Sequence, residues 1–241
     1  MAATKPKRRS ARKGKSLREL DELLTRLEEV HGKTPYASRF SPMDELVCCI
    51  LSQHTSDANS FPAFARLKEQ FPEWQSVVAA GAEGVAPIIR QAGLANQKAK
   101  SIVRALDEIH RRTGSYSIDH LQGLSMLEAR DWLMELPGVG PKTASIVLCF
   151  SFGMGAIPVD THIFRVSQRI GMLPKSCTAD KAHDLLLDLV PPDDAFRYHT
   201  TLITHGRKIC KARNPLCGEC PINDICPSAA TFMKKASGKQ K

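Results

Sequence analysis

The chain has 241 residues, of which 42% are hydrophobic, so length and composition allow one or two folded domains and exclude a chain that is disordered throughout. No apolar run approaches the roughly 20 residues of a membrane span, and no signal peptide opens the chain. We therefore expect a cytoplasmic protein, associated with the nucleoid if it is bacterial. The formal net charge of +9 is smaller than the sum of the seven Lys or Arg in residues 1–15 and the four in residues 234–241, so any basic surface on the body is a local patch.

Both ends of the chain, residues 1–15 and 234–241, carry no acidic residue and almost nothing apolar. Such segments cannot bury enough apolar surface to fold, so we predict two basic disordered tails. Added affinity for nucleic-acid phosphates and a solubilising or targeting role are equally open for them.

Between the tails, apolar residues recur at helical spacing almost throughout. A capping box at Ser16–Glu19 opens the first predicted helix, and Ser41 followed by Pro42 opens the second. Alternating strand patterns are nearly absent, so we predict an all-α protein of about ten helices. The other predicted helices cover residues 60–71, 83–92, 97–112, 126–135, 142–152, 161–170, 179–189 and 195–208.

Residues 136–144 read LPGVGPKTA and join two of these helices. Glycines allow close backbone approach, and a proline suits the first turn of the helix that follows. The main-chain amides around Gly138, Val139 and Gly140 are therefore predicted to hold a DNA phosphate, as in a helix-hairpin-helix. An ordinary turn between two helices is the alternative.

Lys142 follows this turn, at the start of the next predicted helix. The N-terminus of a helix disfavours the ammonium form of a lysine, so this position favours a neutral amine that can act as a nucleophile. A further phosphate contact is the alternative. Asp160 stands 18 residues later, in PVDTHIF, where it could cap a helix or stabilise positive charge at a sugar C1′. His162, beside it, is a minor catalytic candidate.

Four cysteines, Cys210, Cys217, Cys220 and Cys226, lie within 17 residues near the C-terminus. Their spacing suits a single metal centre, and both a zinc ion and a [4Fe–4S] cluster accept four thiolates. Residues 195–213 contain five Lys or Arg and no acidic residue. This stretch is the predicted local basic patch, with Lys211 and Arg213 beside the first cysteine.

Together, LPGVGPKTA, VDTHIFR and the cysteine spacing resemble the endonuclease III family of DNA glycosylases, over about residues 17–227. The resemblance implies a two-domain helix-hairpin-helix fold with a [4Fe–4S] cluster. A six-helix barrel would span residues 35–154, and the cluster domain residues 155–233, joined by the N-terminal helix at 16–34. The implied reaction is excision of oxidised pyrimidines followed by abasic-site lyase cleavage, with Lys142 as nucleophile and Asp160 as catalytic aspartate.

The resemblance also implies residues that enter the duplex. Leu94, in AGLANQKA, falls at the wedge position of the family, where an apolar side chain enters the base stack. LSQHTSD matches the segment that fills the space left by a flipped nucleotide, so Gln53 and His54 are predicted to contact DNA. The family commonly has glutamine where this chain has His54, which leaves the preference for the opposite base open.

The expected partner is double-stranded DNA with a damaged base or an abasic site, bound by a monomer, with no membrane association. Two alternatives remain at this point. An adenine-mismatch glycosylase shares the hairpin and the cluster, but it generally lacks this lysine and has an extra C-terminal domain. A non-catalytic DNA-binding or redox-sensing relative would keep the scaffold, although Lys142 and Asp160 together argue against it.

Overall fold

The computed structural model describes residues 17–237, and within this range the secondary structure is entirely helical. The predicted all-α fold is therefore confirmed. The N-terminal tail and Ser16 of the predicted capping box lie outside the described residues, as do residues 238–241.

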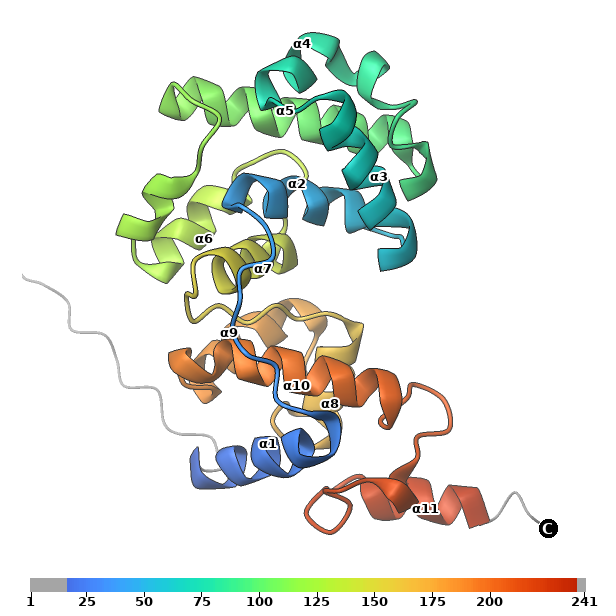
Figure 1. Ribbon diagram of the computed structural model, residues 1–241. Coiled ribbons are helices and arrows are strands. Elements are labelled where there is room, and N and C mark those ends of the chain that lie inside the picture. The colour runs from blue at the N-terminus through green and yellow to red at the C-terminus, as the bar shows by residue number, and fades with distance from the viewer. Residues whose placement is uncertain (1–16, 238–241) are drawn as a thin grey trace, which may run out of the picture.

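Six α-helices surround the first hydrophobic core, in the upper half of Figure 1. In chain order they are α2 (Pro42–Ser52), α3 (Asp57–Gln70), α4 (Trp74–Val85), α5 (Ala95–Thr113), α6 (Met126–Met134) and α7 (Pro141–Ser151). Two short 3-10 helices, η1 (Arg90–Ala92) and η2 (Asp119–Gly123), precede α5 and α6. Helix α2 begins as predicted, because the hydroxyl of Ser41 accepts the Asp44 amide at 3.2 Å.

A second core lies in the lower half of Figure 1 and combines the two ends of the described chain. Leucines of the first helix pack against apolar residues of the helices after residue 160. The helices that supply this core are α1 (Leu17–His31), α8 (Thr161–Arg169), α9 (Ala179–Leu189) and α10 (Ala195–Lys208), with η3 (Pro192–Asp194) before α10. The short η4 (Cys217–Glu219) and the helix α11 (Ala229–Ser237) follow in the chain. We keep the domain boundaries given above as a proposal, supported by these two separate cores.

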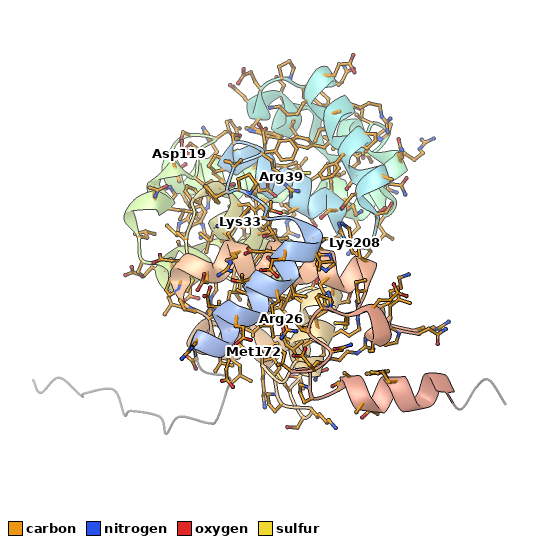
Figure 2. The ribbon with its side chains drawn as sticks, turned by 60° about the horizontal axis from the view of Figure 1, so that its bottom comes forward. Arg26, Lys33, Arg39, Asp119, Met172 and Lys208 are labelled. Atoms are coloured by element: carbon orange, nitrogen blue, oxygen red, sulfur yellow. The ribbon has the colours of Figure 1, made fainter. Side chains whose placement is uncertain are left out.

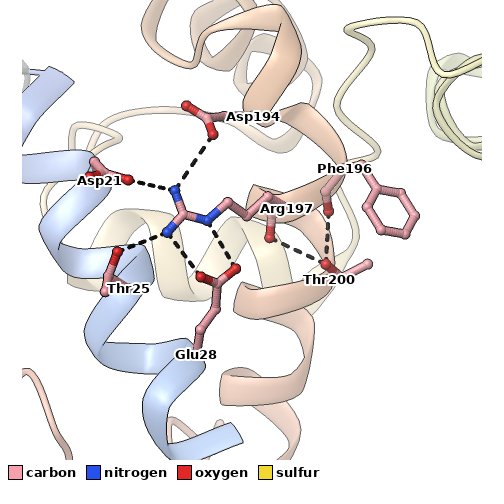
Figure 3. A network of polar contacts seen from close by, with 7 residues as sticks. All are labelled: Asp21, Thr25, Glu28, Asp194, Phe196, Arg197 and Thr200. Carbon is pink, nitrogen blue, oxygen red and sulfur yellow. Dashed lines mark hydrogen bonds and ion pairs between the residues drawn. The ribbon is translucent and has the colours of Figure 1, made fainter. Parts of the chain in front are cut away.

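Arg197 of α10 joins the N-terminal helix to this second core (Figure 3). Its guanidinium makes two 2.9 Å hydrogen bonds to the carboxylate of Glu28 and one of 2.6 Å to Asp21. Thr25 accepts a further one. A guanidinium has five N–H donors in one plane, and here its hydrogen bonds to Asp21, Thr25 and Glu28 attach α10 to α1. Arg197 therefore does not belong to the basic patch in which the sequence placed it.

One predicted helix is wrong in position, and the predicted start of the C-terminal tail is also wrong. The helix expected over residues 83–92 is α4, which begins at Trp74 and ends at Val85. Pro87 follows, and a proline inside a helix removes a hydrogen bond and clashes with the preceding turn. At the C-terminus, α11 continues to Ser237, past residue 234, where the disordered tail was expected to begin.

The chain passes between the two cores twice. Residues 32–41 run from α1 to α2, and residues 152–160 lead from α7 to α8 (Figure 1). Lys33 and Arg39 mark the first of these crossings in Figure 2. Helix α7 belongs to the first core and α8 to the second, and residues at the N-termini of both helices line one cavity between the two cores.

Candidate functional site

The hairpin between α6 and α7 requires a glycine at one position and leaves open space at another. Gly138 has a φ of 82°, and a Cβ on it would lie 2.8 Å from the Cβ of Ser101. Gly140 has a φ of −105° and open space where a Cβ would stand. Helical geometry leaves the amides of the first turn of α7 without intrahelical partners. The Val139 amide is engaged with Leu136 O at 3.1 Å, so the open amides begin at Gly140.

These two glycines give a matched pair of substitutions. Gly138→Ala should lower the free energy of unfolding by about 2 kcal/mol or more, because a left-handed residue and a close contact both penalise the methyl group. Gly140→Ala should cost under about 1 kcal/mol, the effect of alanine at an N-cap, yet weaken DNA binding. Denaturant unfolding and fluorescence anisotropy measure the two effects, and equal stability losses would contradict the assignment.

Lys142 and Asp160 line one cavity of about 270 Å³ at the junction of the two cores. Lys142 projects from the first turn of α7 and is exposed. Asp160 is the N-cap of α8, where its Oδ1 accepts the Ile163 amide at 2.7 Å. Neither side chain forms an ion pair with any other described residue. The capping role and an open carboxylate oxygen are therefore compatible in the same residue.

His199 of α10 also lines this cavity, and the sequence analysis did not identify it. Burial lowers its pKa to about 4, although the nearby carboxylate of Asp160 acts in the opposite sense. Its Nδ1 lies 2.9 Å from Pro158 O, and because a carbonyl only accepts, Nδ1 carries the proton. The neutral ring is left with Nε2 as an acceptor. The pair of histidine and carbonyl thus holds α10 against the segment that leads to Asp160.

Predicted catalytic candidate His162 has a packing role. Its Nδ1 lies 3.1 Å from a guanidinium nitrogen of Arg165, and its Cβ would be 3.1 Å from a Cβ placed on Gly206. The glycine therefore lets α8 and α10 approach closely around this histidine. His162 is absent from the residues that line the cavity.

The remaining walls of the cavity combine aromatic and charged groups. Arg39 lies within 5.6 Å of the ring centres of Phe61 and Phe150. Its guanidinium also hydrogen-bonds at 2.8 Å to Glu45, a carboxylate with 0% exposure. A buried carboxylate is stable only when it is paired, so this ion pair fixes the arginine in the wall. Arg207 and Asp57 form a further ion pair of 3.4 Å, in which both side chains are more than half exposed.

The residues predicted to enter the duplex lie at the apices of two loops. Leu94 is 54% exposed with a φ of 49°, and His54 is exposed with a φ of 54°. Gln53, predicted to contact DNA, uses its amide nitrogen to donate to Gly138 O at 2.8 Å. It therefore supports the hairpin from the end of α2.

The four cysteines of the C-terminal motif line a common cavity beside α8 and α11. Nitrogens of two side chains lie against their sulfurs. A guanidinium nitrogen of Arg169 is 3.4 Å from the Cys210 Sγ, and Nε2 of His205 is 3.7 Å from the Cys220 Sγ. Burial lowers the pKa of His205 to about 4, so its ring is neutral and one nitrogen can donate. Four cysteines around one cavity suit an iron–sulfur cluster, and N–H groups that donate to the sulfurs would tune such a cluster.

Arginines of α8 hold the cluster loop, and the sequence analysis did not single them out. Arg165 donates to Cys210 O at 3.0 Å, and Arg169 donates to the carbonyls of Lys211 and Ala212 at 2.7 and 3.1 Å. The aromatic ring of Phe232 lies 4.4 Å below the Arg169 guanidinium. Because backbone carbonyls of the loop turn toward α8, its side chains Lys211 and Arg213 are left exposed.

Replacing Lys211 and Arg213 together by alanine should weaken DNA binding without sequence dependence. The slope of log K against log salt should fall by at most about two units, because each phosphate contact contributes about one. The matched control is the exposed pair Lys175 and Lys181, whose replacement should leave the slope unchanged. If the salt slope of the variant without Lys211 and Arg213 stays the same, the cluster loop does not contact the phosphates.

Three comparisons with known proteins agree with this geometry. Residues 47–192 match the HhH-GPD superfamily of base excision DNA repair proteins, and residues 210–226 match the iron–sulfur binding domain of endonuclease III. Endonuclease III of Escherichia coli is 36% identical over 206 residues, covering 85% of this chain and 93% of the relative. A non-covalent endonuclease III–DNA complex and a trapped covalent endonuclease III–DNA intermediate each match with a TM-score of 0.77 at 28% identity, covering 90% of this chain and 98% of theirs.

The fold and the hairpin thus define a helix-hairpin-helix protein of base excision repair. With the matching cluster motif and near full-length similarity, the chain belongs to the endonuclease III family. It is a DNA glycosylase and abasic-site lyase that binds DNA and holds a [4Fe–4S] cluster. Within residues 17–237, no helix is both long and apolar enough to cross a membrane.

Proposed function

We propose that this enzyme, acting as a monomer, excises oxidised pyrimidines from double-stranded DNA through a Schiff base on Lys142. The neutral amine attacks C1′ of the flipped nucleotide, the N-glycosidic bond breaks, and the base leaves with a proton. Opening of the sugar ring gives a protonated imine. Loss of a proton from C2′ then expels the 3′ phosphate by β-elimination, which cleaves the strand, and hydrolysis of the imine by water releases the lysine. Asp160 stabilises the positive charge that develops at C1′ and relays protons.

The observation that carries this proposal is the shared cavity of Lys142 and Asp160. One group comes from α7 and the other from the N-cap of α8, so residues of both cores complete the site within one chain. A second copy of the chain is not needed to supply either group, which supports a monomer. The solved structure of a trapped covalent intermediate between an endonuclease III and DNA supports a covalent step.

The cavity walls suit a flat, hydrogen-bonding base. The rings of Phe61 and Phe150 offer stacking surfaces, which enzymes use to hold flipped bases. Thr200 and Thr204 line the same cavity, and the hydroxyl of each donates to a helix carbonyl, at 2.9 and 2.8 Å. Because each hydroxyl has a single proton, both are left as acceptors for base N–H groups.

Borohydride trapping on duplexes tests this proposal. One duplex carries an abasic site, a second an oxidised pyrimidine, and a third an oxidised purine. We expect a covalent adduct with the first two and little with the third. An adduct with the purine lesion alone would reject the substrate class, and strand cleavage without any trappable adduct would reject the Schiff base.

Leu94→Ala should reduce excision from an intact duplex by about tenfold, because unstacking a paired base costs a few kcal/mol and the wedge offsets part of it. A substrate whose target base is already unpaired should lose far less. Leu127, 51% exposed on α6, provides the matched control. Equal losses of Leu94→Ala on both substrates would make it an ordinary surface residue.

A further inference from the structure

Lys98 of α5 is a buried lysine with two unusual partners. It is 3% exposed, and its Nζ donates to Leu51 O and to Ala92 O, each at 2.7 Å. None of the described acidic residues pairs with it. Burial lowers its pKa, as expected for an amine away from water. Burying such a group is costly unless it is hydrogen-bonded, so the two carbonyls account for its place in the fold.

Both carbonyls lie at helix ends. Leu51 is in the last turn of α2, and Ala92 is the last residue of η1. Carbonyls at the C-terminus of a helix lack intrahelical partners and carry partial negative charge, so a single amine can cap two of them. Lys98 therefore joins the ends of two elements that are far apart in the sequence.

Each capped element leads within three residues to a residue predicted to enter DNA, namely His54 after Leu51 and Leu94 after Ala92. These two have positive φ values of 54° and 49°. Among the described residues outside glycine, only Asn214 shares that conformation. A left-handed residue other than glycine costs free energy and persists where its surroundings hold it. Lys98 supplies a common anchor for both loops.

We propose that Lys98 is a positioning residue that holds the wedge loop of Leu94 and the filler loop of His54 at a fixed separation, so that both side chains enter the duplex together. The proposal rests on the proposed function and on the expectation that Leu94 and His54 both contact DNA. In this proposal Lys98 affects the step in which the nucleotide flips out of the duplex and does not affect the attack on C1′. Loss of the anchor should therefore slow the enzyme on stacked, paired substrates alone.

The test compares Lys98→Met with Lys100→Met under single-turnover conditions. Methionine has a similar length but no donor, and Lys100 is an exposed lysine on the same helix. We expect Lys98→Met to lose about tenfold or more on a paired lesion, and less than about twofold on the same lesion in single-stranded DNA. Lys100→Met should lose neither. Similar losses on both substrates, or none on either, would overturn the proposal.

A double-mutant cycle with Leu94→Ala separates positioning from general destabilisation. If Lys98 acts through the wedge, the double variant should lose clearly less than the product of the two single losses. If the loss of rate in the double variant equals the product of the two single losses, the two residues act independently, and the proposed positioning role of Lys98 is wrong. Rates are expressed per folded molecule, with Lys98→Gln, which keeps N–H donors, as a second variant. If neither variant folds, Lys98 is required by the whole fold and the proposal fails.

The outcome for Leu94→Ala alone keeps the two proposals apart. If that variant loses equally on paired and single-stranded substrates, the wedge assignment itself fails. If Leu94→Ala is slower on paired DNA alone and Lys98→Met is not, Leu94 acts as the wedge but Lys98 does not position it.

Discussion

Lys142→Gln should abolish the borohydride-trapped adduct with abasic-site DNA while binding of the same duplex stays within about fivefold, the range of one exposed charge. The reason is a division of roles inside the hairpin. We expect the open main-chain amides that begin at Gly140 to hold the phosphate, whereas the exposed Lys142 lines the cavity together with Asp160. Replacing the amine should therefore remove the nucleophile and leave the contacts between the main-chain amides and the phosphate in place.

The measurement pairs gel detection of the adduct with fluorescence anisotropy on the same duplex. Lys175→Gln, at another exposed lysine, should keep both adduct and affinity. An adduct that persists in Lys142→Gln would mean that another amine attacks C1′. Full strand cleavage with a large loss of affinity would make Lys142 a phosphate contact and reject its catalytic role.

Local signals in the sequence were sufficient for much of the site. Pro141 marks the first turn of α7 and Asp160 caps α8, so both proposed catalytic groups could be placed at helix starts before any fold was known. The cysteine spacing likewise defined one centre, because all four residues lie in a single short stretch. These features depend on neighbours within a few residues, which a sequence displays directly.

Partners distant along the chain could not be predicted. Lys98 resembles any solvent-exposed lysine of a helix until α5 packs beside Leu51, 47 residues earlier. Arg197 belongs to a basic stretch in the sequence, but Glu28, 169 residues away, neutralises it. His199 becomes part of the site only because the carbonyl of Pro158, 41 residues before it, accepts a hydrogen bond from its ring. Helical periodicity says which face is buried and nothing about which distant residue covers it.

Asp160→Asn should lower the rate of base excision by about 10²- to 10⁴-fold, the range for losing a positioned acid or base. Stability should change by less than about 1 kcal/mol, because asparagine is as good an N-cap as aspartate and its side-chain oxygen can still accept the Ile163 amide. His199 offers no substitute for the lost negative charge, because an imidazole is either neutral or positively charged, and burial favours the neutral ring by lowering its pKa to about 4. The variant thus separates the charge of residue 160 from its capping bond.

Asp160→Ala completes the comparison, because alanine removes both the charge and the cap. It should be as slow as Asp160→Asn and in addition less stable by about 1 kcal/mol. Single-turnover excision and denaturant unfolding of the three proteins give both quantities. If Asp160→Asn excised the base at the rate of the parent enzyme, while Asp160→Ala were slow only in proportion to its unfolded fraction, the aspartate would be a helix cap alone. Stabilisation of the charge at C1′ would then have to come from another group in the cavity.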